Sequence, residues 1–190
     1  MKTILFANRK GGVGKSFCSC ETVMSLRRSS IRTSFIDLDM QEGALLKTEE
    51  LPDAEAVILD CPGALTGDLP GLIADADVFC VPTLPSIVDE PSLQLMIDAY
   101  KTHGKAGSRL IVIINRFTRW KNSADFLALV NDLIADIENA EVITMMQSES
   151  VMQAALADKS VVEFAPKSTA AASVLAMVNQ IRVAAGFSKE

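Results

Sequence analysis

The chain has 190 residues, of which 49% are hydrophobic, and it carries a formal net charge of −6 with a pI of about 4.9. This length and hydrophobic content suit one core, so we expect a single domain over residues 1–190. The acidic charge excludes a chain that binds nucleic acid over its whole surface and leaves room only for a local basic patch. Its longest apolar run, residues 110–114, is too short to cross a bilayer, and we expect a cytoplasmic protein.

Apolar segments of strand length alternate with segments of helical spacing along most of the chain. The predicted strands span residues 2–7, 33–38, 56–60, 77–82, 109–114 and 141–145, and the predicted helices span 15–28, 89–103, 122–138, 148–158 and 169–185. Such alternation is typical of an α/β fold with a buried parallel sheet. We therefore predict one mostly parallel, twisted sheet with helices on both faces.

A glycine-rich segment follows the first predicted strand and has the layout of a phosphate-binding loop. Its residues 10–16 read Lys-Gly-Gly-Val-Gly-Lys-Ser. Glycines let successive backbone N–H groups point at phosphate oxygens, and the helix that begins near Lys15 adds the positive end of its dipole. In such a loop Lys15 reaches the β and γ phosphates and Ser16 binds Mg²⁺. The predicted nucleotide-binding residues here are Gly11, Gly12, Val13, Gly14, Lys15, Ser16 and Phe17.

The loop departs from the general pattern G-x-x-x-x-G-K-[ST], because Arg9 stands where the first glycine would be and Lys10 is an additional lysine. This departure resembles the deviant Walker A loop of the ParA/MinD family of dimerising ATPases. The resemblance implies a P-loop NTPase fold, ATP and Mg²⁺ as cofactors, and a homodimer that encloses two ATP molecules. It also implies that Lys10 reaches the partner subunit's nucleotide and, together with Lys15, has a catalytic role.

Two carboxylates are expected at the end of the second predicted strand. Asp37 and Asp39 are two residues apart, so on an extended chain they point the same way, at the edge where parallel sheets bind ligands. Residues 37–41, Asp-Leu-Asp-Met-Gln, resemble the family's D-x-D-x-Q motif, which implies that Asp39 positions the attacking water. Asp37 is then expected to support Mg²⁺ and its waters. Taken alone, the pair would also fit an ordinary strand end.

The third predicted strand ends in a carboxylate, Asp60, followed by Cys61, Pro62 and Gly63. This resembles a Walker B strand followed by the family's D-x-P-[PG] turn. An aspartate that closes an apolar strand is costly unless a charge lies opposite it, and Mg²⁺ beside Ser16 would supply that charge. The predicted metal-binding residues are Ser16, Asp37 and Asp60.

Asn115 follows the fifth predicted strand, and in the resembling family an asparagine at this place contacts the adenine. A GTPase would need Asn-Lys-x-Asp, whereas residues 115–118 read Asn-Arg-Phe-Thr, so ATP is favoured over GTP. The four cysteines form no C-x-x-C pair, and we expect buried side chains rather than an iron–sulfur or zinc site: Cys18, Cys20, Cys61 and Cys80.

The resemblance is closest to the small partition ATPases, in which ATP drives dimerisation and slow, partner-stimulated hydrolysis reverses it. It implies non-specific DNA binding on the nucleoid and a ParB-like DNA-binding adaptor protein as partner. The densest basic cluster lies around Trp120 and consists of Arg116, Arg119 and Lys121, which are the candidate DNA contacts. Three further basic residues are nearby in sequence: Lys101, Lys105 and Arg109.

Two alternatives remain open. A MinD-like membrane role needs an amphipathic helix with a basic polar face, but Arg182 is the only cation in residues 174–187, so no stable membrane association is expected. A metabolic ATP-dependent ligase or kinase could use the same fold without dimerising. The chain also differs from the family in one respect, because only eighteen residues separate Gln41 from Asp60.

Overall fold

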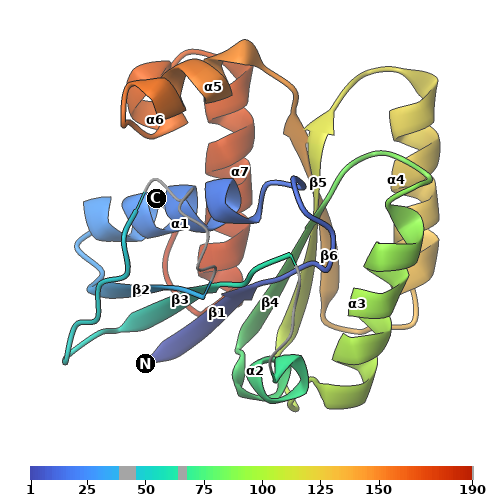
Figure 1. The fold of residues 1–190 in the computed structure, drawn as a ribbon, viewed down its shortest axis with the longest axis horizontal. Coiled ribbons are helices and arrows are strands. Elements are labelled where there is room, and N and C mark those ends of the chain that lie inside the picture. The colour runs from blue at the N-terminus through green and yellow to red at the C-terminus, as the bar shows by residue number, and fades with distance from the viewer. Residues whose placement is uncertain (39–45, 64–67, 190) are drawn as a thin grey trace.

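One six-stranded sheet organises the protein. The computed structural model describes residues 1–38, 46–63 and 68–189, and in them all strand pairs are parallel in the order β2-β3-β1-β4-β5-β6 (Figure 1). The predicted parallel α/β fold is thereby confirmed, and each predicted strand is found within a few residues of its expected bounds. The strands are β1 (Lys2–Phe6), β2 (Thr33–Asp37), β3 (Ala56–Asp60), β4 (Val78–Thr83), β5 (Arg109–Phe117) and β6 (Ala140–Met146).

Helices cover both faces of the sheet. Side chains alternate along β1, so that Ile4 and Phe6 enter one apolar core while Leu5 enters the other. Helices α1 and α7, with α5 and α6 beside them, lie over the first core, and α2, α3 and α4 lie over the second (Figure 1). The helices are α1 (Lys15–Arg28), α2 (Leu69–Asp75), α3 (Glu90–His103), α4 (Lys121–Ile134), α5 (Glu149–Leu156), α6 (Val161–Phe164) and α7 (Thr169–Ala184).

The structure corrects the predicted helices in three places. Helix α2 was not predicted, because it is short and contains proline and glycine; its N-cap Asp68 accepts a hydrogen bond from the Gly71 N–H at 2.9 Å. Helix α6 is a single turn capped by Ser160 and was also missed. Helix α4 spans Lys121–Ile134, whereas the predicted helix spans 122–138, so the helix ends four residues earlier than expected.

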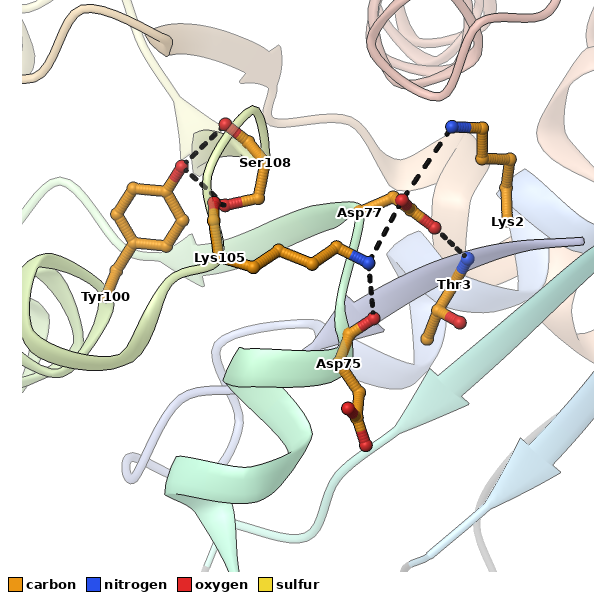
Figure 2. Close-up of polar contacts among 7 residues, drawn as sticks. All are labelled: Lys2, Thr3, Asp75, Asp77, Tyr100, Lys105 and Ser108. Carbon is orange, nitrogen blue, oxygen red and sulfur yellow. Dashed lines mark hydrogen bonds and ion pairs between the residues drawn. The ribbon is translucent and has the colours of Figure 1, made fainter.

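The amino ends of the central strands are held by a charged cluster (Figure 2). Asp77, just before β4, accepts the N–H of Thr3 at 2.9 Å and pairs with Lys105 at 3.1 Å. Partial burial raises the pKa of Asp77. The Thr3 N–H and the charges of Lys105 and Lys2 lower it by more, so the pKa of Asp77 lies below its ordinary value. Lys105 also donates to the carbonyl of Asp75 at 2.9 Å. Lys105 therefore lies at the amino edge of the sheet and is already paired there.

Helix α7 packs on the domain through a buried face. Arg182, the cation considered for a membrane-binding helix, is 2% exposed, and its guanidinium donates to the Ser29 hydroxyl and to the Ser188 carbonyl. Residues 174–187 therefore present no basic face. No helix in the described part of the chain is both long and apolar enough to span a bilayer. All four cysteines are buried, as predicted.

A buried carboxylate joins α1 to α6. Glu21 is 2% exposed, and its Oε1 accepts the N–H of Val161 at 2.7 Å. Arg28, about two turns further along α1, donates to the Ser160 hydroxyl at 3.2 Å. Burial raises the pKa of Glu21 to about 6, although the Val161 N–H and the Arg28 charge lower it. Ionisation of Glu21 therefore lowers the stability of the folded state at neutral pH.

This cost predicts a pH-dependent effect of Glu21→Gln. The pKa of Glu21 is raised from 4.5 to about 6 in the folded state, so wild-type stability is full below pH 4.5 and declines as the pH rises through 6. The variant does not ionise, and relative to wild type it should gain up to about 2 kcal/mol between about pH 4.5 and 7.5. Urea unfolding at both pH values measures this gain. Glu50→Gln, at an exposed carboxyl, is the control, and a pH-independent difference for Glu21→Gln would contradict the account.

Candidate functional site

The loop between β1 and α1 has the backbone shape of an anion-binding site. Gly12 and Gly14 have φ values of +74° and +99°, in the left-handed region that favours glycine. Gly14 is the N-cap of α1, which begins at Lys15 and has no acidic residue in its first turn. The N-terminal N–H groups of this helix therefore face no competing carboxylate from that turn and suit a phosphate. This agrees with the phosphate-binding role predicted for residues 11–16.

Asn115 is brought against this loop by an irregularity in β5. The register of β5 on β6 shifts between Ile114 and Phe117, and Arg116 has a φ of +53°, so the strand bulges at this point. The Asn115 side chain donates from Nδ2 to the Val13 carbonyl at 3.0 Å. A Cβ on Gly14 would lie 2.2 Å from the same Nδ2, so Gly14 is required by space as well as by φ. The predicted base-contacting residue thus packs directly on the glycine loop.

Asp60 is a fully buried carboxylate behind the loop, and among the described residues neither of its oxygens has a well-formed hydrogen bond. The nearby Ser19 hydroxyl donates instead to the Ser16 carbonyl at 3.0 Å. Burial raises the pKa of Asp60 to about 6; the Ser16 hydroxyl lowers it, while the charge of Asp37 raises it.

These contacts bring the three predicted metal-binding residues together. Asp37 and Asp60 are also register partners at the ends of β2 and β3. Two neighbouring carboxylates, one of them buried without a well-formed hydrogen bond, suit a hard divalent cation with oxygen ligands. The residues present therefore fit Mg²⁺, and Ser16, Asp37 and Asp60 are the ones that would hold it.

Lys15 lies between the loop and the turn that follows β3. Its ammonium donates to the Lys10 carbonyl at 3.2 Å, and the side chain is largely buried. A Cβ on Gly63 would lie 3.2 Å from the Gly11 nitrogen and 3.5 Å from the Lys15 ammonium. The turn after β3 therefore approaches the loop closely enough for a bound phosphate to contact both.

Lys10 is held by its own subunit. Its ammonium forms an ion pair with Asp89, which is 2% exposed, at the N-terminus of α3. Its backbone N–H donates to Asn8 Oδ1 at 3.0 Å, and the Ser92 hydroxyl donates to the same oxygen at 2.7 Å. Sequence analysis did not identify Asp89, Asn8 or Ser92 as site residues. Their partners lie about eighty residues away in the chain, so no local pattern identifies them.

A cleft of about 900 Å³ opens beside the start of α1. Phe17 and Asn115, both predicted to bind the nucleotide, line it together with Gly14 and Ser16. The far wall includes Trp120 and Met152, which are 78% and 71% exposed. A mostly apolar cleft with a few polar groups, continuous with an anion-binding loop, suits a nucleoside. Sequence reasoning did not place Trp120 in this site.

The candidate DNA-contacting residues lie beside the same cleft. Arg116, Arg119 and Lys121 are exposed at the end of β5 and the start of α4. Lys101 and Arg109 are instead paired with acids, Lys101 with Asp136 at 2.8 Å and Arg109 with Glu141 at 3.6 Å. The basic residues noted in the sequence thus divide into two groups. Asp39, the predicted water-positioning residue, lies outside the described residues.

Comparisons with known proteins agree with this geometry. The model of the CobQ/CobB/MinD/ParA nucleotide binding domain matches residues 4–161. A search of curated proteins finds no match. The structure of apo McdA from Cyanothece is similar with a TM-score of 0.77 and 19% identity, over 97% of this chain and 99% of that one.

Two further solved structures share the fold. MinD from Pyrococcus horikoshii, complexed with Mg-ADP, has a TM-score of 0.71 and 13% identity, with 95% of each chain covered. A ParA family ATPase from Chlorobium tepidum has a TM-score of 0.72 and 17% identity, over 93% of this chain and 97% of that one. Since the family model matches most of the sequence, this chain belongs to the CobQ/CobB/MinD/ParA nucleotide-binding domain family.

Proposed function

We propose that this protein is a ParA-type partition ATPase. Mg²⁺-ATP would drive a sandwich dimer that binds non-specific DNA, and slow hydrolysis stimulated by a ParB-like adaptor would dissolve it. In this function the protein is cytoplasmic and associated with the nucleoid, and it segregates or positions DNA or another cargo. The observation that best supports the proposal is the meeting of Lys10, the glycine loop and Asp60 at one edge of the sheet.

Each part of the site has a task in nucleotide binding. The N–H groups of the loop and of the first turn of α1 hold the phosphates, and Lys15 neutralises their charge. Ser16, Asp37 and Asp60 would hold Mg²⁺, which would neutralise part of the charge of the phosphates. Phe17 and Asn115 contact the nucleoside in the cleft. The absence of the Asn-Lys-x-Asp sequence after β5 supports ATP over GTP.

Dimerisation requires that ATP bind the dimer better than the monomer, because a ligand shifts only an equilibrium whose two states it binds differently. Lys10 creates that difference if its ammonium reaches the partner subunit's phosphates. The Lys10 side chain is 35% exposed, so it lies at the surface of the subunit that a partner would cover. Asp39 then positions the water that attacks the γ phosphate.

DNA binding is the output of the proposed switch. Arg116, Arg119 and Lys121 give one subunit a small exposed basic group, and dimerisation doubles it. Two weak patches on one rigid dimer bind with much greater avidity than either alone. The membrane alternative has less support, since Arg182 lies on the buried face of α7. No observation favours a metabolic ligase or kinase.

Nucleotide binding is tested through Trp120, the single tryptophan of the chain. Its fluorescence should change on titration with Mg²⁺-ATP, and Mg²⁺-GTP should bind at least about tenfold more weakly. Asp60→Asn removes the buried charge that faces the metal and should weaken Mg²⁺-ATP binding by about tenfold or more. Asp136→Asn, at an exposed carboxyl between α4 and β6, is the matched control. Equal affinities for wild type and Asp60→Asn would refute the metal assignment.

Dimerisation is tested by analytical ultracentrifugation with Mg²⁺-ATP and with ADP. Lys10→Ala should stay monomeric with ATP, because it loses the contact that makes ATP favour the dimer. Asp39→Ala should accumulate the dimer by blocking hydrolysis. Lys167→Ala, which removes an exposed lysine elsewhere, should behave as wild type. Normal dimerisation of Lys10→Ala would show that Lys10 has no role across the interface.

DNA binding is tested by co-sedimentation of Asp39→Ala protein with non-specific DNA. Binding should require ATP and should fall about 10³-fold between about 50 and 200 mM salt if the dimer makes six phosphate contacts. Combined alanine substitution of Arg116, Arg119 and Lys121 should abolish binding without preventing dimerisation. Substitution of the acid-paired Lys101 and Arg109 is the control. Full DNA binding by the triple variant would remove this surface from the account.

A further inference from the structure

We propose that Asp89 is a positioning residue that holds the Lys10 ammonium within its own subunit and so sets the ATP concentration at which the dimer forms. This inference rests on the proposed function and deepens it. The observation behind it is the Lys10–Asp89 ion pair, in which the acid is 2% exposed and the lysine side chain 35% exposed. The lysine that is expected to contact the partner subunit is thus paired within its own chain.

The backbone of Lys10 is fixed independently of its side chain. Asn8 Oδ1 accepts the Lys10 N–H at 3.0 Å, while Asn8 Nδ2 donates to the Pro82 carbonyl at 2.8 Å. Ser92, in the first turn of α3, donates its hydroxyl to the same Asn8 oxygen at 2.7 Å. Asn8 therefore binds the loop, the end of β4 and α3 together. With the backbone held in this way, the Lys10 ammonium can exchange partners by side-chain rotation alone.

The backbone of Asp89 is also held by hydrogen bonds, so Asp89 does not move with the Lys10 side chain. Its N–H donates to the Ser86 carbonyl at 2.9 Å, and its carbonyl accepts the Leu93 N–H at 3.1 Å, which closes the first turn of α3. Separation of Lys10 from Asp89 would therefore leave a carboxylate in a buried place. An unpaired buried charge is strongly unfavourable, so the ion pair opposes release until another group compensates for it.

Helix α3 offers Asp89 a second partner. Asp89 is the N-cap of α3, yet in the described structure its side chain makes no capping hydrogen bond. An N-cap carboxylate normally accepts an N–H two or three residues later, and Pro91 at the second position has none, which leaves the Ser92 N–H. The charge is also favoured by the positive end of the helix dipole. When it is not paired with Lys10, the Asp89 carboxylate is thus still stabilised by the positive end of α3.

Asp89 and the partner subunit's nucleotide thus compete for the Lys10 ammonium. Without nucleotide, the ion-pair partner of the Lys10 ammonium among the described residues is Asp89. In the dimer, the partner subunit's triphosphate attracts the ammonium, and the positive end of the α3 dipole stabilises the Asp89 carboxylate. The strength of the Lys10–Asp89 pair then subtracts from the free energy with which ATP drives association. Weakening this pair should let the dimer form at lower ATP concentration.

Asp89→Asn separates the charge from the cap, because asparagine is as good an N-cap as aspartate but pairs weakly with an ammonium. With Mg²⁺-ATP, the concentration that gives half-maximal dimer should fall by about fivefold or more relative to wild type, within the usual range of coupling energies. Asp68→Asn, the same change at the N-cap of α2, is the matched control and should not shift it. Asp89→Ser, another good cap, serves as the second variant if Asp89→Asn unfolds.

A second readout needs no nucleotide. Acetylation of the Lys10 ammonium by an amine-reactive ester, followed by mass spectrometry of the apo protein, should be about fivefold faster in Asp89→Asn than in wild type. The acetylation rate of exposed Lys121 in the same samples is the internal reference. Equal Lys10 rates in the two proteins would show that Asp89 does not hold the lysine.

The two readouts distinguish the possible failures. Faster labelling together with an unchanged or higher ATP requirement would overturn the gating role of Asp89 while leaving the proposed function intact. Failure of wild type itself to dimerise with ATP would refute the proposed function and the gating role together. Faster labelling with dimerisation at lower ATP is the result that the structure predicts.

Discussion

The site depends on a loop whose N–H groups must face a ligand while its other polar groups are satisfied by the protein. Two asparagines from different strands do this: Asn8 accepts the Lys10 N–H, and Asn115 donates to the Val13 carbonyl. Each lies at the carboxyl end of a parallel strand, β1 or β5, so both reach the loop from the same edge of the sheet.

The charges around this loop suit a nucleotide bound with a metal ion. On one side, Asp60 is buried without a well-formed hydrogen bond and lies beside Asp37, which favours a cation. On the other side, the Lys15 ammonium lies against the loop, where it donates to the Lys10 carbonyl, and it favours phosphate. A nucleotide bound with Mg²⁺ would place a cation beside Asp60 and phosphate oxygens beside Lys15. The same arrangement explains why the buried Asp60 is tolerated at all, since its cost is offset when ligand binds.

The sequence predicted those parts of the fold and site that depend on local patterns. Six strands, five helices and the loop around Gly14 follow from periodicity, glycine spacing and polar residues at strand ends. Helix α6 was missed because a single turn has no period to detect; Ser160 caps it, and contact with Glu21, 140 residues away in sequence, helps to hold it. The pairing of Lys10 with Asp89 was missed for a related reason. The topology, not any local motif, brings the start of α3 beside the loop.

The most direct test of the account is a crystal structure of Asp39→Ala protein grown with Mg²⁺-ATP. The account predicts a two-fold dimer in which the Lys10 ammonium contacts phosphate oxygens of the partner subunit's ATP, with Mg²⁺ beside Ser16 and Asp60. A monomer with ATP bound and Lys10 still paired with Asp89 would contradict the central claim that this lysine joins two subunits through their nucleotides.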